Sequence, residues 1–218
     1  KNQIDTIPDW NEHVYLMNPY ERIIEFNDYK INRAYFKIYE INNYINKQFE
    51  VSSKFLHLCE APGAFSLFMK EQYPSSTSLS VSLNGVIRFD DSVSNYQYTD
   101  ITKEIVDYPD CDFITADGCD EIKNYKEQEQ ELIRLIFFEC LNALCNQKEG
   151  GTFVCKVFDC NTLPTCQILF ILTQFYTSIE FFKPVNSRPA NSEKYLIATD
   201  YHFNITLLEE LIAFSKTF

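Results

Sequence analysis

Apolar residues follow two different spacings along this chain. Continuous or alternating apolar runs predict strands, and apolar residues three and four positions apart predict amphipathic helices. The strand-like runs are 55–58, 79–83, a short run ending near Asp100, 111–116, 152–157, 178–182 and 194–199. The helix-like segments are 31–46, 63–72, a segment after Asp100, 127–146, 162–176 and 207–214. Strands that alternate with helices predict an α/β domain with a mostly parallel sheet.

The stretch from Phe55 to Phe65 carries the first sign of a ligand site. Its apolar run ends at Glu60, and a Pro62-Gly63 turn leads into a second apolar run. A buried strand that enters a tight turn and then a helix has this pattern. Glycine allows close approach of the backbone to a ligand, and the helix start offers unpaired N–H groups. The pattern indicates the first crossover of a nucleotide-binding sheet, although an ordinary strand–turn–helix has the same signal.

Five blocks of sequence resemble the FtsJ-like RNA 2′-O-methyltransferases, in the order that this family has them. They are 32–37 (NRAYFK), 60–65 (EAPGAF), 114–118 (ITADG), 150–159 (GGTFVCKVFD) and 182–195 (FKPVNSRPANSEKY). The last two resemble most closely the branch that acts on mRNA caps. The resemblance implies a Rossmann-like methyltransferase fold: a mostly parallel seven-stranded sheet with helices on both faces. We expect residues 32–218 to form this domain and residues 1–31 to be an N-terminal extension.

The same resemblance implies which residues carry the chemistry. Its catalytic set corresponds to Lys37, Asp117, Lys156 and Glu193. It implies S-adenosyl-L-methionine as the methyl donor, with binding residues Glu60, Ala61, Pro62, Gly63, Phe65, Asn84, Asp100 and Asp117. The loop before the glutamate offers groups suited to phosphates and 2′-hydroxyls of RNA, namely Ser187, Arg188 and Asn191. The family's second loop glycine is replaced by an alanine, which is tolerated where φ is negative.

Four of these residues also have a plain structural explanation. Lys37 falls beside the apolar stripe of its helix, where a lysine is usually solvated. Asn84 precedes a glycine, and an Asn-Gly pair often forms a turn. Asp100 can cap a following helix, and Asp117 can form an Asp-Gly turn. The family blocks raise Lys37 and Asp117 above such explanations. For Asn84 the turn alone explains the residue equally well, and Asp100 can both cap a helix and bind the donor.

Lys156 is the least ordinary charged residue, because it lies inside an apolar strand. Burying a lysine is costly unless it is paired. In the reaction that the resemblance implies, a base takes the proton of a ribose 2′-hydroxyl as the methyl group is attacked in line. Burial, a second lysine and the positive donor all disfavour the ammonium form. We therefore interpret Lys156 as the base, Lys37 as orienting the ribose, and Asp117 and Glu193 as holding the lysine by hydrogen bonds.

Composition supports a globular domain of 218 residues, with 45% hydrophobic and 23% charged residues. No apolar run approaches the length of a membrane span, so we expect no membrane partner. Eight cysteines form no C-x-x-C pair, and the three histidines are scattered, so we expect no metal site. We expect the cysteines to be buried free thiols. Such thiols are typical of a reducing intracellular compartment. The composition is rich in Asn, Ile, Lys and Tyr, which is typical of proteins from A/T-rich viral genomes. We therefore expect the protein to be located in the cytoplasm, in a viral factory or in the virion.

The net charge of −12 opposes binding to RNA by the chain alone, since RNA-binding proteins usually present a basic face. The expected partner is RNA, most simply capped mRNA, with an additional domain or protein supplying basic surface. Candidates for stacking on a cap are only Tyr15, Tyr20 and Phe26. Two alternatives stay open: a 2′-O-methyltransferase of ribosomal or transfer RNA, and a catalytically silent methyltransferase-like binding subunit.

Overall fold

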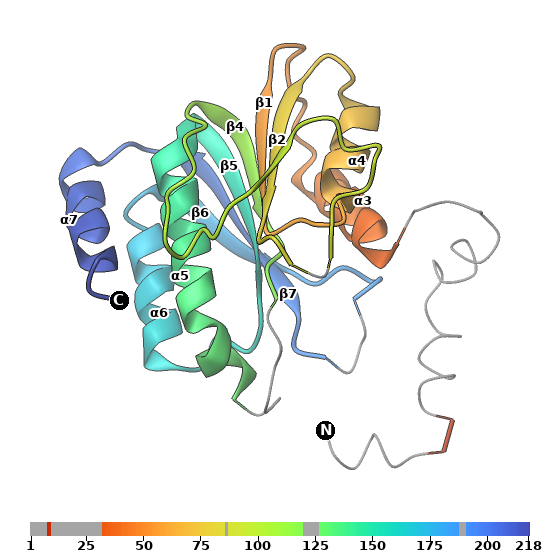
Figure 1. Ribbon diagram of the computed structural model, residues 1–218. Coiled ribbons are helices and arrows are strands. Elements are labelled where there is room, and N and C mark those ends of the chain that lie inside the picture. The colour runs from red at the N-terminus through yellow and green to blue at the C-terminus, as the bar shows by residue number, and fades with distance from the viewer. Residues whose placement is uncertain (1–7, 10–31, 86, 120–126, 188–190) are drawn as a thin grey trace.

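A computed structural model describes residues 8–9, 32–85, 87–119, 127–187 and 191–218. The predicted extension at residues 1–31, including the three aromatic candidates for cap stacking, lies almost wholly outside these ranges. Figure 1 shows one twisted sheet between two layers of helices, which is the predicted architecture.

Seven strands form a single sheet in the order β3-β2-β1-β4-β5-β7-β6. Their bounds are β1 Lys54–Leu58, β2 Thr77–Ser82, β3 Tyr96–Tyr98, β4 Cys111–Ala116, β5 Gln147–Val157, β6 Tyr176–Phe182 and β7 Lys194–Tyr201. The strands β1 to β5 pair in parallel, and β7 runs antiparallel to both β5 and β6. The predicted fold class, a mostly parallel seven-stranded Rossmann-like sheet, is confirmed.

Helices cover both faces of the sheet (Figure 1). The helices α3 and α4 lie on one face, and α5, α6 and α7 lie on the other. Their bounds are α3 Arg33–Ile45, α4 Ala64–Gln72, α5 Gln128–Asn146, α6 Leu163–Leu172 and α7 Ile205–Ser215. No helix in the described ranges is long and apolar enough to cross a bilayer.

Alternation along the buried strands divides the core into two clusters, because successive side chains point to opposite faces. On β1, Phe55 belongs to the cluster under α3 and α4, whereas Leu56 and Leu58 belong to the cluster under α5 to α7. His57 points to the first face and is fully buried, with Nδ1 2.8 Å from Oγ1 of Thr115 on β4. Burial lowers the pKa of His57 to about 3, so this histidine is a neutral core residue.

The two largest boundary differences from the sequence prediction lie at the ends of α6 and α5. The helix α6 ends at Leu172, and Tyr176 already opens β6. Phe175 and Tyr176 follow Leu172 by three and four positions, which is helical spacing, but their burial comes from packing at the start of a strand. The strand β5 begins at Gln147, directly after α5, instead of following the glycine pair at 150–151.

The predicted helix after Asp100 is wrong. Residues 101–104 form a turn, in which Oδ1 of Asp100 accepts hydrogen bonds from the backbone N of Thr102 at 3.1 Å and its hydroxyl at 2.7 Å. A short polar side chain can close such a turn as well as cap a helix. The side chain of Asp100 therefore does bind the following backbone, as the sequence indicated, but it closes a turn instead of capping a helix.

Candidate active site

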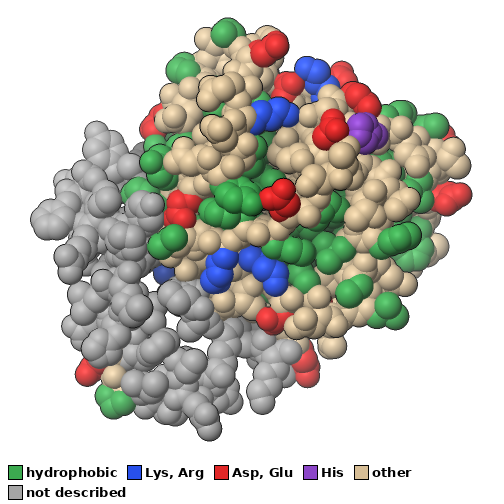
Figure 2. Space-filling view, turned by 180° about the vertical axis from the view of Figure 1, so that it is seen from behind, with side chains coloured by type: hydrophobic (Ala, Val, Ile, Leu, Met, Phe, Trp, Pro, Cys, Tyr) green, Lys and Arg blue, Asp and Glu red, His purple; other side chains and the backbone are tan. Residues whose placement is uncertain are grey.

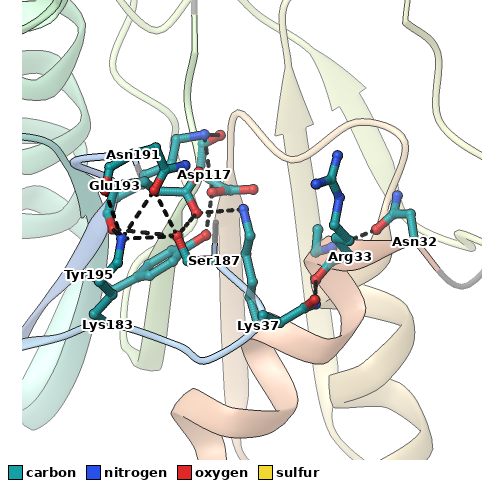
Figure 3. Close-up of polar contacts among 12 residues, drawn as sticks. Asn32, Arg33, Lys37, Asp117, Lys183, Ser187, Asn191, Glu193 and Tyr195 are labelled. Carbon is teal, nitrogen blue, oxygen red and sulfur yellow. Dashed lines mark hydrogen bonds and ion pairs between the residues drawn. The ribbon is translucent and has the colours of Figure 1, made fainter. Parts of the chain in front are cut away.

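The sheet brings the four predicted catalytic residues together in two ion pairs. Lys156 lies in β5 and pairs with Asp117, which follows β4, with Nζ 3.2 Å from Oδ1. Lys37 on α3 pairs with Glu193, which directly precedes β7, with Nζ 2.7 Å from Oε1. Figure 3 shows Lys37 reaching from its helix toward Glu193, with Asp117 beside them. Segments far apart in the chain thus form one polar site at the carboxyl edge of β4.

Lys156 is held from two directions by the same residue. Its Nζ donates to the backbone carbonyl of Asp117 at 2.7 Å as well as to the carboxylate. Burial lowers the pKa of the Lys156 amine, but Asp117, Cys119, Glu193 and Glu139 raise it more, and its net pKa lies above the ordinary value. Without donor and substrate, Lys156 is therefore an ammonium ion at neutral pH.

Glu193 is fixed by partners on two elements. Besides the ion pair with Lys37, its Oε1 accepts a hydrogen bond from the hydroxyl of Ser187 at 2.9 Å. Burial raises the pKa of Glu193, but Lys37, Lys156 and the Ser187 hydroxyl lower it below its ordinary value. The predicted RNA-binding residue Ser187 is 2% exposed, so in this state it orients Glu193.

Two residues that the sequence analysis did not select hold this constellation in place. The hydroxyl of Tyr195 is fully buried and donates to Oδ1 of Asp117 at 2.8 Å. On α3, Glu40 accepts the backbone N–H groups of Val185 and Asn186 at 2.6 and 3.1 Å, tying the helix to the loop before β7. Tyr195 follows Glu193 by two residues, so along a strand the two side chains point to the same face. Glu40 follows Lys37 by three residues, so on a helix the two side chains also lie on the same face. That spacing was the available signal.

A polar pocket of about 250 Å³ opens beside the Lys37–Glu193 pair. Its lining residues are Arg33, Lys37, Asn186, Asn191 and Glu193. The predicted RNA-binding residue Asn191 therefore faces this pocket, where its Oδ1 also accepts from Nζ of Lys183 at 3.0 Å. Arg188 lies outside the described residues. The pocket offers both cationic groups and amides, which suits phosphate and ribose oxygens.

A larger hollow of about 580 Å³ lies between α5, α6 and α7. Phe137, Phe170 and Phe214 are among its lining residues, and the described lining includes neither a carboxylate nor an amine. Among its lining residues only Cys166 has an ionisable side chain, so the smaller polar pocket, with Lys37 and Glu193, is the better candidate for the reaction.

The predicted donor loop has a backbone conformation that favours glycine, and it carries a buried acid. Gly63 has φ of 116°, a conformation that favours glycine, and precedes the first residue of α4. Oε1 of Glu60 accepts the N–H groups of Phe65 and Ser66 at 2.6 and 2.9 Å, at the start of α4. Its Oε2 is buried and has no hydrogen-bond partner among the described residues. Burial raises the pKa of Glu60 to about 8 against the lowering effect of these N–H groups.

The other predicted donor residues differ in what they expose. Phe65 is 1% exposed and packs in the core cluster with Tyr195, so it can present only backbone to a ligand. Asn84, after β2, is exposed. Asp100 is partly buried, and hydrogen bonds from Lys103 and Thr102 hold its pKa below the ordinary value. Ala61 and Pro62 form the turn between Glu60 and Gly63.

None of the eight cysteines, all of which lie in the described residues, forms a disulfide, but their burial varies more than we expected. Cys119 and Cys166 are exposed, whereas Cys111, Cys140 and Cys155 are buried. Among the described residues no group of three His, Cys, Asp or Glu side chains could hold a metal ion. On the described part of the face in Figure 2, Lys and Arg occur in small groups next to Asp and Glu.

Comparison with known proteins gives the same family over most of the chain. A family model described as FtsJ-like methyltransferase matches residues 31–201. The cap-specific mRNA (nucleoside-2′-O-)-methyltransferase of Autographa californica nuclear polyhedrosis virus is 33% identical over 177 residues, which is 70% of this chain and 67% of that protein. Cap-specific mRNA (nucleoside-2′-O-)-methyltransferase 2 of Drosophila melanogaster is 27% identical over 185 residues, or 67% of this chain. The matched part is only 26% of the fly protein.

Among solved structures, a ribosomal RNA methyltransferase from Plasmodium falciparum superposes with a TM-score of 0.63 at 15% identity, covering 80% of this chain and 100% of that chain. At this identity the likeness supports the fold alone. The family match over residues 31–201 and the baculovirus relative go further: this chain belongs to the FtsJ-like methyltransferase family.

Proposed function

We propose that this chain is an S-adenosyl-L-methionine-dependent RNA ribose 2′-O-methyltransferase that acts on the first transcribed nucleotides of capped mRNA. The observation that carries the proposal is the double ion pair of Lys156 with Asp117 and Lys37 with Glu193, next to a polar pocket. The cap as target is supported by the names of the viral and fly relatives.

In the proposed reaction, different residues deprotonate the ribose hydroxyl and orient the ribose. A ribose 2′-hydroxyl is a weak nucleophile until a base takes its proton. In our proposal Nζ of Lys156 is that base, held by the carboxylate and the carbonyl of Asp117. Because its pKa is raised in the resting site, Lys156 must lose a proton before it acts. Lys37, held by Glu193, orients the ribose.

The donor loop fits a cationic, amine-bearing ligand. When bound, S-adenosyl-L-methionine supplies an electrophilic methyl group on a sulfonium. Oε2 of Glu60 is a buried acceptor without a partner among the described residues, and such an atom is costly unless a ligand donor reaches it. We propose that Oε2 of Glu60 accepts a hydrogen bond from the amino group of the methyl donor. Gly63 would let the backbone of the loop come close to the methyl donor.

Donor affinity is expected to rise with pH because Glu60 must ionise to pair with an ammonium group. Its pKa in the free protein is raised to about 8, so binding releases a proton below that pH. Affinity should then increase up to about tenfold per pH unit below pH 8. Calorimetry at pH 6 to 8, in buffers of different ionisation enthalpy, measures both the affinity and the proton released.

Two variants separate Glu60 from other acids of the site. Glu60→Gln should remove the pH dependence together with most of the affinity. Asp100→Asn is the matched control, since the pKa of Asp100 is lowered and it stays ionised over this range. It should weaken binding without changing the slope, and a slope that survives Glu60→Gln would refute the role of Glu60.

The polar pocket is our proposed entrance for the RNA. Lys37, Arg33 and Asn191 line it, and Ser187 lies behind it against Glu193. The net charge of −12, and the small groups of basic residues on the described part of the face in Figure 2, leave little attraction for a long RNA backbone. We therefore propose that a further domain or protein partner supplies a basic surface.

Methyl transfer from labelled S-adenosyl-L-methionine to short RNAs tests the function directly. The RNAs carry a 7-methylguanosine cap, an unmethylated cap or a 5′-triphosphate, and one set has a 2′-O-methyl group already on the first nucleotide. We expect transfer to capped RNA only, with no label added where the 2′-position is blocked. Equal transfer to uncapped RNA would support another RNA target, and donor binding without transfer to any RNA would indicate a silent binding subunit.

A further inference from the structure

Glu139 is a buried carboxylate directly beneath the proposed catalytic pair. It comes from the middle of α5 and is 0% exposed. Its Oε1 accepts the backbone N–H of Gly118 at 2.9 Å, and its Oε2 lies 3.6 Å from the thiol of Cys155. The thiol of Cys59, after β1, also lies close to this carboxyl, and burial together with this carboxyl raises the pKa of the thiol. Glu139 therefore joins the ends of β1, β4 and β5.

The close packing at Gly118 shows how tightly this carboxyl supports the chain after β4. A Cβ added at Gly118 would lie 2.3 Å from Oε1 of Glu139 and 2.9 Å from Cδ2 of Leu135. Neither distance is possible without movement of one of the groups. The backbone after Asp117 thus lies directly on the Glu139 carboxyl.

Glu139 and Lys156 bind opposite ends of one peptide group. The peptide between Asp117 and Gly118 donates its N–H to Glu139 and accepts from Nζ of Lys156 on its C=O at 2.7 Å. In a trans peptide these two groups point in opposite directions. A carboxylate at one end and an ammonium at the other polarise the peptide in the same sense, which strengthens both hydrogen bonds.

The charge of Glu139 is set by the groups that face it from every neighbouring element. Burial raises its pKa to about 7, and Asp117 adds to this, while Lys156, the Gly118 N–H and the Cys59 thiol lower it. Cys155 faces it from β5, and Cys140, next to it on α5, raises the pKa of the Cys155 thiol. Above about pH 7 the carboxyl is ionised, and over that range its charge acts on Lys156.

We propose that Glu139 is a positioning residue for Lys156: its carboxylate holds the Asp117–Gly118 peptide, and its charge strengthens the hold of the Lys156 amine on a proton. This rests on the proposed role of Lys156 as the base. The two carboxylates of the ion pairs are partners that the family resemblance already implied. Glu139 is a third acid, on the opposite side of the peptide, and it shifts the pH at which Lys156 loses its proton and can act as the base.

The test removes the charge and keeps the hydrogen bond. Glu139→Gln retains an oxygen for the Gly118 N–H but carries no charge. In single-turnover transfer by the whole chain, the acid limb of the pH–rate profile should move to lower pH by about half a unit to one unit, because Lys156 then loses its proton more easily. Donor affinity should stay the same. Glu139→Asp, which keeps the charge but retracts the carboxyl, should leave the limb in place and lower the maximal rate.

Glu129→Gln is the matched control on the same helix. Glu129 is also a buried carboxylate of α5, but it accepts the N–H groups of Asn161 and Thr162 at 3.0 and 2.9 Å, before α6. Its removal should cost stability and leave the acid limb unchanged. An acid limb that is the same in Glu139→Gln as in the wild type would overturn the proposal and leave Glu139 a structural residue.

A second readout does not need transfer at all. The side-chain Nζ and Cε signals of labelled lysines, with Lys156 assigned through Lys156→Met, report the titration of Lys156 directly. Glu139→Gln should lower its midpoint, and an unchanged midpoint would overturn the inference. If the wild type transfers no methyl group to any RNA, the proposed function fails, while this titration still decides whether Glu139 acts on Lys156.

Discussion

Lys156→Ala is expected to abolish methyl transfer, lowering the single-turnover rate by about 10²- to 10⁴-fold, the usual range for loss of a general base. Lys156 is 7% exposed, and its Nζ lies 3.2 Å from the carboxylate of Asp117. Donor affinity should change little, because Glu60 and the Gly63 turn belong to a different loop. The rate is measured with saturating donor and capped RNA, and affinity by calorimetry.

Two further substitutions distinguish a base from a structural cation. Lys156→Arg keeps a positive charge and hydrogen-bond donors for Asp117, but a guanidinium does not lose its proton near neutral pH. It should be as inactive as the alanine variant while melting close to the wild type. Lys156→Met keeps the length of the side chain without charge and shows how much stability the ion pair contributes.

The outcome that contradicts the assignment is activity in Lys156→Arg. Transfer at more than a tenth of the wild-type rate would mean that Lys156 acts as a cation that stabilises developing charge. Loss of donor binding in Lys156→Ala would mean that the pair with Asp117 maintains the donor site, and the rate loss would then say nothing about proton transfer.

Gly63→Ala is expected to remove donor binding and to lower the free energy of unfolding by about 2–4 kcal/mol. Two effects add. The φ of 116° at Gly63 is strained for alanine, and its Cβ would lie 2.3 Å from Cγ2 of Val93. The segment that carries Val93 is bound to the same loop, since the N–H of Asp90 donates to the carbonyl of Pro62 at 2.9 Å. The loop would therefore have to move away from this segment.

Controls separate strain from collision. Gly150→Ala also places alanine at a positive φ, 71°, but its Cβ meets no atom within 4 Å, so it measures strain alone. The double variant Gly63→Ala with Val93→Ala removes the colliding methyl group and should recover part of the stability. Ala64→Gly changes the neighbouring residue, which is the first of α4 and is not among the residues with positive φ, and should leave donor binding intact.

Calorimetry with S-adenosyl-L-methionine and chemical unfolding give the two readouts. Wild-type donor affinity in Gly63→Ala would show that the donor does not need this turn. Equal instability of Gly63→Ala and of the double variant would show that contact with Val93 is not the cause.

Local patterns in the sequence determined most of the elements of this fold. The strand at Cys111–Ala116 was predicted at both ends, because a continuous apolar run closes at an Asp-Gly pair. The helix at Gln128–Asn146 was predicted to within one residue from its helical apolar spacing. The predictions failed where the same residue pattern is compatible with two structures. Asp100 could cap a helix or close a turn, and in the structure its side chain closes a turn.

The order of the sequence blocks also determined which residues carry the proposed chemistry, and the sheet brought four of them together. The sequence did not reveal their partners. Glu40 holds the loop before β7, Tyr195 holds Asp117, and Glu139 lies beneath the Asp117–Gly118 peptide. Each contact joins elements distant in the chain. Spacing can place Glu40 and Tyr195 on the same face as a catalytic residue, but it does not say which group each of them binds.

Protonation was decided by the tertiary structure alone. The sequence interpretation expected burial to favour the neutral amine of Lys156, but surrounding acids hold its pKa above the ordinary value. Conversely, burial raises the pKa of Glu60 and Glu139 to about 8 and about 7. The sequence by itself determined the family, the fold class and the identity of the ionisable groups, because motifs and periodicity are local. Only the fold decided which groups are charged, because desolvation and Coulomb interactions depend on distances between atoms that the sequence does not contain.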